Sequence, residues 1–250
     1  MNTIVVIPAR FQSSRFPGKP LVMIAGKSLI HRVWERCVRA LHHKYVFVAT
    51  DNEEISRHCK GLGIQTVMTS DICLTGTDRV YEASKQIPAD VIVNVQGDEP
   101  LIDPNDILKI IAAHKERPDC IHNGMCPIHT EEDFRDTTVP KVVAARDGTL
   151  LYMSRGAIPT TKKLDFVPGL AQRQVCIYSF MPEALEAFGK CSVKAPLEQA
   201  EDIEILRFID LGYKVRMISL SENPVAIDTP EDVEKAEEII RERGLTHSFS

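Results

Sequence analysis

Three cationic side chains follow the first apolar run of the sequence. Residues 4–7 are apolar and predict a buried strand that ends at Pro8, and Arg10, Arg15 and Lys19 come next, in a loop of small residues. Such a loop lets backbone N–H groups approach a phosphate, and fixed cations neutralise its charge. The stretch contains neither a P-loop nor a dinucleotide-binding fingerprint. It therefore indicates an anion site of another kind, with an ordinary solvated strand-to-helix loop as the alternative.

Carboxylates at two distant positions suggest a metal site. Asp98 and Glu99 come almost directly after residues 91–95, the most strand-like run in the chain. An acidic pair there is costly unless a cation uses it, and Mg²⁺ takes few carboxylates beside substrate phosphates. Asp98 or Glu99 could instead cap the next helix. Asp228 is a second candidate, although the run Asp228-Thr-Pro-Glu-Asp also has the form of a helix N-cap.

Two further runs of polar residues are weaker candidates for ligand binding. In Thr75-Gly-Thr-Asp-Arg79, Gly76 permits a close backbone approach and Arg79 offers a forked donor for phosphate or ribose oxygens, although a plain helix cap explains the run as well. Glu198 and Glu201 lie three apart on an expected helix over 197–211, and so share a face. That face is either solvated or a rim that binds the hydroxyl groups of a polar substrate.

Alternating strands and helices must position these residues. The sequence predicts strands near residues 4–7, 45–49, 66–68, 91–95, 175–180 and 215–220, and a hairpin of 141–145 with 150–153. It predicts helices after Ser28, over 53–62, 75–86, 103–115, 182–188 and 197–211, and from about 228 to 243. This order predicts an α/β fold with a mostly parallel sheet covered on both faces. Ligands bind beyond the carboxyl ends of such strands, where the loops after Ile7, Val48 and Val95 lie.

Composition excludes several other classes. The chain has 250 residues and a net charge of -5, which argues against a nucleic-acid or polybasic membrane protein. It has no apolar run of membrane-spanning length, and Met1-Asn2 leads straight into a strand, so we expect no membrane insertion and no signal peptide. The seven cysteines lack C-x-x-C spacing and predict free thiols in a cytoplasmic protein. No Ser/His/Asp or Cys/His arrangement suggests covalent catalysis. A cationic loop with an acidic strand end indicates instead a nucleoside triphosphate with Mg²⁺, and phosphoryl or nucleotidyl transfer.

Several short motifs, which follow one another along almost the whole chain, are similar to those of a known protein family. They are Ile7-Pro-Ala-Arg10 with Ser14-Arg15, Pro17-Gly-Lys-Pro-Leu21, Val48-Ala-Thr-Asp51, Gly76-Thr-Asp-Arg79, Asn94-Val-Gln-Gly-Asp-Glu-Pro100, Leu151-Tyr-Met-Ser-Arg155, Ile158-Pro159, Ile177-Tyr178, Leu206-Arg207 and Asp228-Thr-Pro-Glu-Asp232. With these motifs the chain resembles the cytidylyltransferases that activate 3-deoxy-D-manno-octulosonate (Kdo), the CMP-Kdo synthetases. The resemblance implies a Rossmann-like nucleotide-diphospho-sugar transferase fold with a smaller loop and hairpin lobe. It also implies transfer of CMP from CTP to the anomeric hydroxyl of a 2-keto-3-deoxy sugar acid, with Mg²⁺, and a homodimer formed through 154–194.

The resemblance also implies roles for individual residues. Those implied to bind the nucleotide are Ala9, Arg10, Ser14, Arg15, Lys19, Thr75, Gly76, Arg79 and Gln96. Those implied to bind the sugar are Gln96, Arg155, Gln174, Tyr178, Glu198 and Glu201. Asp98 and Asp228 are the implied metal ligands, and Arg10, Lys19 and Asp98 the implied catalytic residues. Within a single domain 1–250, residues 1–135 are then mainly nucleotide-binding, 136–227 form the sugar and dimer lobe, and 228–250 return a metal ligand with the last helix.

Departures from the family pattern fall on the sugar side. Gln174 stands where the family usually has His, Cys176 where it has Gly, and Ile205 where it has Gln. Pro140 and Ala226 also depart from the pattern. Lost hydrogen-bonding groups would alter a site for a polyhydroxylated sugar. We therefore expect either Kdo or a variant such as 8-amino-Kdo as the substrate, with ordinary drift around a normal Kdo site as the alternative explanation.

Other functions remain as alternatives on the sequence alone. They are a cytidylyltransferase for a different small acid, a sugar-1-phosphate nucleotidylyltransferase and a non-enzymatic nucleotide-binding module. The acidic 198–204 segment argues against holding a sugar phosphate, and a binding module has no need of Asp98 and Asp228.

Overall fold

The computed structural model describes residues 1–12, 16–222 and 225–244. The chain packs as two compact units. Unit 1 comprises Met1–Thr3, Pro88–Val93 and Asp106–Asn223, and unit 2 comprises Ile4–Ile87, Asn94–Asn105 and Pro224–Ser250. This division reflects which residues pack against one another. The predicted division into nucleotide-binding and sugar-binding parts concerns function and stays a prediction.

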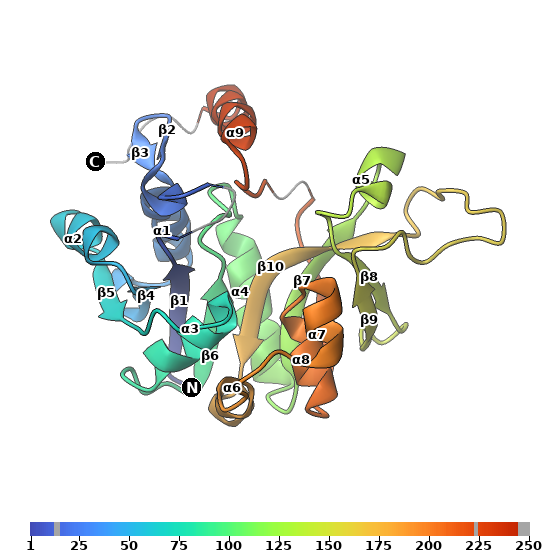
Figure 1. Ribbon diagram of the computed structural model, residues 1–250, viewed down its shortest axis with the longest axis horizontal. Helices are drawn as coiled ribbons and strands as arrows, with labels where there is room; N and C mark the ends of the chain where they lie inside the picture. Colours follow the sequence, from blue (N-terminus) through green and yellow to red (C-terminus); the bar gives the residue numbers. More distant parts are fainter. Residues whose placement is uncertain (13–15, 223–224, 245–250) are drawn as a thin grey trace. The chain divides into compact units, whose positions relative to one another are not determined.

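Unit 2 contains the strands and helices of the N-terminal half and the last helix (Figure 1). Its strands are β1 (Thr3–Ala9), β2 (Met23–Ile24), β3 (Lys27–Ser28), β4 (Val46–Thr50) and β5 (Gln65–Met68). Its helices are the 3₁₀ turns η1 (Lys19–Leu21) and η2 (His43–Tyr45), and α1 (Leu29–Ala40), α2 (Glu53–Gly61), α3 (Gly76–Ser84) and α9 (Pro230–Glu242). The residues of β6 (Val91–Val95) are shared between the two units.

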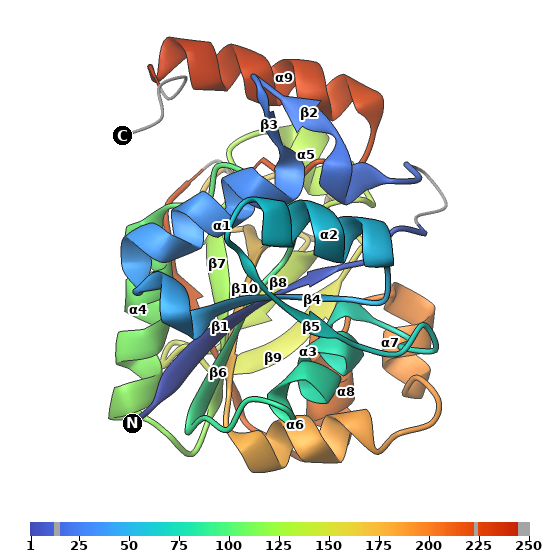
Figure 2. The same cartoon turned by 90° about the vertical axis from the view of Figure 1, so that its left-hand side faces the viewer.

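The sheet of unit 2 is parallel. Its strand order is β6-β1-β4-β5, and β1 and β5 both run parallel to β4, with Ile7 opposite Val48. Figure 2 shows α1 and α2 on one side of these strands and α3 on the other. Residues 4–7 of β1 and the apolar face of α1 are at most 1% exposed, as expected for strands covered on both faces. The predicted α/β class with a mostly parallel sheet is therefore confirmed.

Unit 1 combines a second set of strands with short helices. The strands are β7 (Ile121–Pro127), β8 (Lys141–Ala144), β9 (Leu150–Ser154), β10 (Gln172–Phe180) and β11 (Val215–Ser219). The helices are α4 (Pro104–Glu116), α5 (Glu131–Arg135), α6 (Pro182–Gly189), α7 (Pro196–Glu201) and α8 (Ile205–Asp210). β11 runs parallel to β7, whereas β10 runs antiparallel to it, and β8 and β9 form the predicted hairpin.

Stacked aromatic rings form part of the core of unit 1. The Phe208 ring lies 5.0 Å from that of Phe180 and 4.6 Å from that of Phe188, and all three residues are fully buried. Such rings contribute more than their buried area alone. They fasten α6 and α8 to β10.

Most of the predicted strands and helices are present in the structure. Side-chain N-caps explain where two of the helices, α1 and α2, begin. Ser28 accepts a hydrogen bond from His31 N at the start of α1, and Asn52 accepts from Glu54 N and Ile55 N at the start of α2. The predicted helix over 197–211 is wrong as a single element. Asp202 takes a left-handed conformation with φ 51° and ends α7, and α8 begins at Ile205. Strands β2, β3 and β7 and helix α5 were not predicted.

The cysteines behave as the sequence predicts. All seven remain thiols, and Cys37, Cys59, Cys120 and Cys126 are buried. Burial raises the pKa of the Cys59 thiol to about 12, so this side chain stays protonated and unreactive. Within the described part of the chain, no helix is long and apolar enough to cross a membrane.

A buried histidine pair makes unit 1 sensitive to acid. Ser179 Oγ lies 3.0 Å from His114 Nδ1 and 3.3 Å from His122 Nδ1, and each of these residues is at most 1% exposed. Burial, and then the neighbouring His114 and Arg216, lower the pKa of His122 from 6.5 to about 4. The folded protein therefore binds fewer protons than the unfolded chain, and stability is lost as the pH falls from 6.5 towards 4.

We expect unfolding free energy to drop by about 1–2 kcal/mol between pH 7 and pH 5 because of this group. Urea titrations at pH 7, 6 and 5 measure the drop, and His122→Gln should make it smaller. His42→Gln, at an exposed histidine, is the matched control and should leave it unchanged. An identical pH dependence in His122→Gln and the natural protein would contradict this assignment.

Candidate functional site

One lysine and two aspartates from three distant parts of the chain meet in unit 2. Lys19 Nζ lies 3.1 Å from Asp98 Oδ2 and 3.3 Å from Asp228 Oδ1, and it donates to Ile227 O at 2.7 Å. The side chains of Lys19, Asp98 and Asp228 are 16%, 30% and 33% exposed. The structure thus brings together three of the predicted site residues, in a half-buried setting where charges interact more strongly than in open water.

Backbone contacts hold these residues in place. Ile227 N donates to Asp98 O at 2.9 Å, which fastens the segment before α9 to the loop after β6. Gly97 explains how that loop approaches β1, because a Cβ atom there would lie 2.6 Å from Pro8 O. Real Cβ atoms do not come so close to a carbonyl oxygen. Any other residue at 97 would push Asp98 away from the end of β1.

The hydrogen bonds at the start of α9 show which carboxylate caps that helix. Asp232 Oδ2, and not Asp228, accepts hydrogen bonds from Asp228 N, Thr229 N and Thr229 Oγ1, so Asp232 completes the capping box of α9. Asp103 Oδ1 accepts from Asn105 N at the start of α4. Asp232 and Thr229 thus cap α9, Asp103 accepts a hydrogen bond at the start of α4, and metal binding by Asp98 and Asp228 stays a prediction.

The donor set suits a hard divalent cation. Two carboxylates converge on one point, where a cationic group already sits. Mg²⁺ commonly takes one or two carboxylates and completes its octahedron with water and phosphate oxygens. In residues 1–12, 16–222 and 225–244, no cluster of three or more His, Cys, Asp or Glu side chains could hold a metal by itself. The residues present therefore fit a cation that is shared with a phosphate ligand.

The two aspartates at the start of α9 permit a matched test. Asp228→Asn should lower activity by about 10²-fold or more, because it removes a charged oxygen from the converging pair. Asp232→Asn should instead cost about 1 kcal/mol of stability and keep most activity, because it weakens a cap. Steady-state rates and thermal unfolding of both variants check this, and equal loss of activity in the two would contradict the assignment.

The start of α3 lies against a predicted site residue. Thr75 Oγ1 accepts from Asp78 N as the N-cap of α3, and the next residue is Gly76. A Cβ atom at Gly76 would lie 3.0 Å from both polar ends of the Gln96 amide. Gly76 therefore leaves room for Gln96 beside the helix N-terminus, where the backbone N–H groups favour an anion.

Arg79 has partners within the protein. Its Nη2 donates to Asp51 Oδ2 at 2.8 Å, and its Nη1 donates to Thr69 Oγ1 at 2.6 Å and to Ser70 O at 3.2 Å. The residue is 3% exposed. Its predicted contact with the nucleotide stays a prediction. In this structure Arg79 ties α3 to the ends of β4 and β5.

The remaining residues of the cationic loop divide into two cases. Ala9 is the last residue of β1 and is 4% exposed, and the exposed Arg10 follows it. Ser14 and Arg15, also predicted to bind the nucleotide, lie outside the described residues.

A second group of predicted residues meets in unit 1. Glu201 accepts hydrogen bonds from Ser154 Oγ at 2.7 Å, Arg155 N at 2.8 Å and Tyr152 Oη at 3.2 Å. Partial burial alone would raise its pKa, but these three donors hold the pKa of the Glu201 carboxyl below its usual value. Arg155 donates in turn to Thr137 O, Glu201 O and Asp202 O. Glu201 therefore stays ionised and holds Arg155 in one orientation.

Gln174 and Tyr178 belong to a buried amide network in the same unit. Gln174 Nε2 donates to Asn123 Oδ1 at 2.9 Å and to Tyr178 Oη at 3.1 Å. Asn123 Nδ2 donates to the carbonyls of Val175 and Ile177, where β10 bulges. Asn123 was not predicted as a site residue, because its neighbours His122 and Gly124 give no clear strand pattern. Cys176 lies within this bulge, and Ile205 is fully buried in α8.

Glu198 forms a buried ion pair. Arg207 binds it with two hydrogen bonds of 2.6 Å, both side chains are 1% exposed, and the guanidinium lies 3.7 Å from the centre of the Phe188 ring. Contact of Glu198 with a sugar would require this pair to open. The expectation of a solvated acidic face is wrong for Glu198, because Arg207 on α8 binds its carboxylate.

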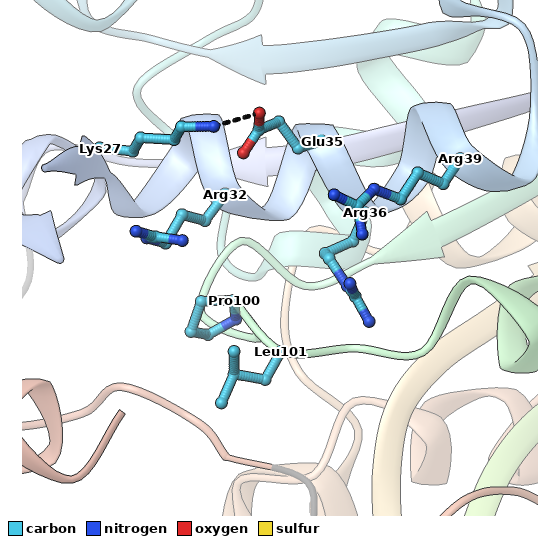
Figure 3. A pocket seen from close by; sticks show the side chains of 7 residues that line it. All are labelled: Lys27, Arg32, Glu35, Arg36, Arg39, Pro100 and Leu101. Atoms are coloured by element: carbon cyan, nitrogen blue, oxygen red, sulfur yellow. Dashed lines mark hydrogen bonds and ion pairs between the residues drawn. The ribbon is translucent and has the colours of Figure 1, made fainter. Parts of the chain in front are cut away.

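A small basic pocket lies in unit 2, and no predicted site residue lines it. The residues that line it are Lys27, Arg32, Glu35, Arg36, Arg39, Pro100 and Leu101 (Figure 3). Lys27 pairs with Glu35, Arg32 donates to Ile24 O and Ala25 O, and Arg36 donates to Ile102 O. The Arg36 contact ties α1 to the loop that carries Asp98, whereas the Lys27 and Arg32 contacts hold α1 against the β2–β3 hairpin.

Comparison with known proteins gives consistent matches. A family model described as cytidylyltransferase matches residues 4–217. A 3-deoxy-manno-octulosonate cytidylyltransferase from Geobacter sulfurreducens is 40% identical over 252 residues, covering 96% of this chain and 100% of that protein. The mitochondrial 3-deoxy-manno-octulosonate cytidylyltransferase of Arabidopsis thaliana is 39% identical over 248 residues, covering 98% and 85%. A solved structure of CMP:2-keto-3-deoxy-manno-octonic acid synthetase complexed with CTP matches with a TM-score of 0.89 and 30% identity, covering 97% and 100%.

Proposed function

The chain belongs to the 3-deoxy-manno-octulosonate cytidylyltransferase family, and from this we propose that it transfers CMP from CTP to a 2-keto-3-deoxy sugar acid of the Kdo type. The observation that carries the proposal is the convergence of Lys19, Asp98 and Asp228 at the end of a parallel strand. CTP carries a triphosphate, which binds well to a positively charged loop and to a divalent cation that also contacts protein carboxylates. A sugar-1-phosphate nucleotidylyltransferase or a binding module is less well supported.

The reaction replaces one P–O bond by another. The anomeric C2 hydroxyl of the sugar acid attacks the α-phosphorus of CTP and loses its proton to solvent, while the bond to the β-phosphate oxygen breaks and pyrophosphate leaves in line. Lys19 and Arg10 neutralise the charge on the departing pyrophosphate. Asp98 and Asp228 would hold Mg²⁺, which would supply positive charge beside the phosphate oxygens and the attacking hydroxyl.

The other predicted residues have supporting roles. Thr75, Gly76 and Gln96 form the part of the nucleotide site at the N-terminus of α3. Arg79, and Ser14 and Arg15 outside the described residues, are also proposed to bind the nucleotide. Arg155, Gln174, Tyr178 and Glu201 contact the sugar acid, and Glu198 contributes through its pair with Arg207. Two features support this: Glu201 orients Arg155 by a backbone hydrogen bond, and a guanidinium suits a sugar carboxylate.

Pyrophosphate release tests the proposal directly. The purified protein is assayed with each of the four nucleoside triphosphates, with Mg²⁺ and with Kdo or another keto-deoxy acid, and the product is identified by mass spectrometry. We expect release with CTP only, and a CMP-sugar product. Absence of CTP-dependent release with every keto-deoxy acid would favour a binding module.

The identity of the sugar acid is a finer proposal. Gln174 in place of the usual family histidine, with Ile205 in place of glutamine, supports a variant acid such as 8-amino-Kdo. The amide of Gln174 is 7% exposed and already donates to Asn123 and Tyr178. The ratio of kcat/KM for 8-amino-Kdo and Kdo measures this preference, and Gln174→His should shift the ratio towards Kdo. A strong preference of the natural protein for plain Kdo would end the variant proposal and leave drift as the explanation.

The assembly and location belong to the same proposal. We expect a homodimer formed through residues 154–194 in the cytoplasm. Sedimentation velocity at micromolar concentration measures the mass of the particle, which should be close to twice that of the 28.0 kDa chain.

A further inference from the structure

Lys19 lies where the proposed metal ion would bind. Its ammonium contacts both carboxylates that would ligate the cation, at 3.1 Å and 3.3 Å, and a third oxygen, Ile227 O, at 2.7 Å. Three oxygens around one positive charge are the kind of surroundings that a hard cation also takes. The ammonium and a divalent cation therefore compete for the same oxygens.

This contact balances the charge of the site. Asp98 and Asp228 approach a single point while each is only about one-third exposed, so two negative charges would repel each other there if no cation lay between them. The hydrogen bond from Ile227 N to Asp98 O keeps their segments together. Lys19 supplies the charge that lets the pair exist without a metal.

We propose that Lys19 is the placeholder cation of the nucleotide-free protein, and that it couples metal binding to nucleotide binding. This inference rests on the proposed function. A divalent cation alone must displace the ammonium from its three oxygens, which weakens its binding. The phosphates of a nucleoside triphosphate offer Lys19 a second set of anionic oxygens and draw it away from the carboxylates. Metal and nucleotide then increase each other's affinity, as reciprocal coupling requires.

Removing the ammonium should break this coupling. In Lys19→Met, Mn²⁺ titrated by calorimetry in the absence of nucleotide should bind at least about tenfold tighter than to the natural protein. The thermal midpoint of Lys19→Met should be lowered without metal, and 10 mM Mg²⁺ should restore most of the loss. The natural protein should show little stabilisation by Mg²⁺ alone.

Lys27 is the matched control. Its side chain is as buried as that of Lys19, at 16% exposed, and it pairs with the single carboxylate of Glu35. Lys27→Met should lose stability without recovery in Mg²⁺ and should leave Mn²⁺ affinity unchanged. Lys19→Gln provides a second variant with a polar side chain if Lys19→Met folds poorly.

The outcomes separate this inference from the proposed function. Unchanged or weaker Mn²⁺ binding in both Lys19 variants would overturn the placeholder role. In that case Asp98→Asn and Asp228→Asn show whether the metal site itself stands, because each should abolish Mn²⁺ binding. Tighter Mn²⁺ binding in the Lys19 variants, lost again when Asp98→Asn is added, would establish the competition.

Discussion

Asp98→Asn is expected to lower kcat for CMP transfer by about 10³-fold or more while leaving the fold intact. Asparagine has the shape of aspartate but lacks the charge that holds a cation beside phosphate oxygens. The side chain is 30% exposed and contacts Lys19, so the substitution removes a partly solvated ion pair and not a core contact. Pyrophosphate release at saturating CTP and Mg²⁺ measures the rate, and circular dichroism with thermal unfolding measures the fold.

An aspartate elsewhere in the chain provides the control. Asp119 pairs with Arg117 at 3.0 Å on the surface of unit 1, and its side chain is 58% exposed. Asp119→Asn removes the same charge and should leave kcat within about twofold. Activity of Asp98→Asn within tenfold of the natural protein would refute the role of Asp98 in metal binding.

Glu198→Gln is expected to lower the free energy of unfolding by about 3–5 kcal/mol, because it leaves the Arg207 guanidinium buried without a counter-charge. In a protein of this size the thermal midpoint should fall by about 10 °C. Both side chains are 1% exposed, so water cannot replace the lost partner. Urea and thermal unfolding monitored by circular dichroism measure the loss.

Two further variants separate the causes. Glu131→Gln breaks the exposed pair with Arg135 and should cost less than about 0.5 kcal/mol. Replacing Glu198 and Arg207 together by methionine should recover much of the loss, since no unpaired charge remains in the core. A higher KM for the sugar acid in Glu198→Gln at unchanged stability would instead indicate that Glu198 contacts the substrate.

Local patterns in the sequence were enough to predict most of the elements. The β-branched run 91–95 predicted β6 to the residue, and Ser28 predicted the start of α1. Both signals are local: a strand needs side chains that suit a buried sheet, and a cap needs a polar side chain within three residues of the N–H it satisfies. The break at Asp202 was missed because the run 197–211 contains neither glycine nor proline, the usual markers of a helix end.

The candidate site shows the limit of such local patterns. The sequence by itself determined which residues carry charge and, through the family motifs, that the chain transfers cytidylyl groups. It left open whether the Asp228 carboxylate binds a metal or caps the last helix, because the run Asp228-Thr-Pro-Glu-Asp has the form of a helix N-cap. It also could not show that Glu198 belongs to Arg207 and Arg79 to Asp51. Only the tertiary structure decided these partners, because the charge of a side chain is local whereas each ion pair joins two different elements, α7 with α8 and α3 with the end of β4.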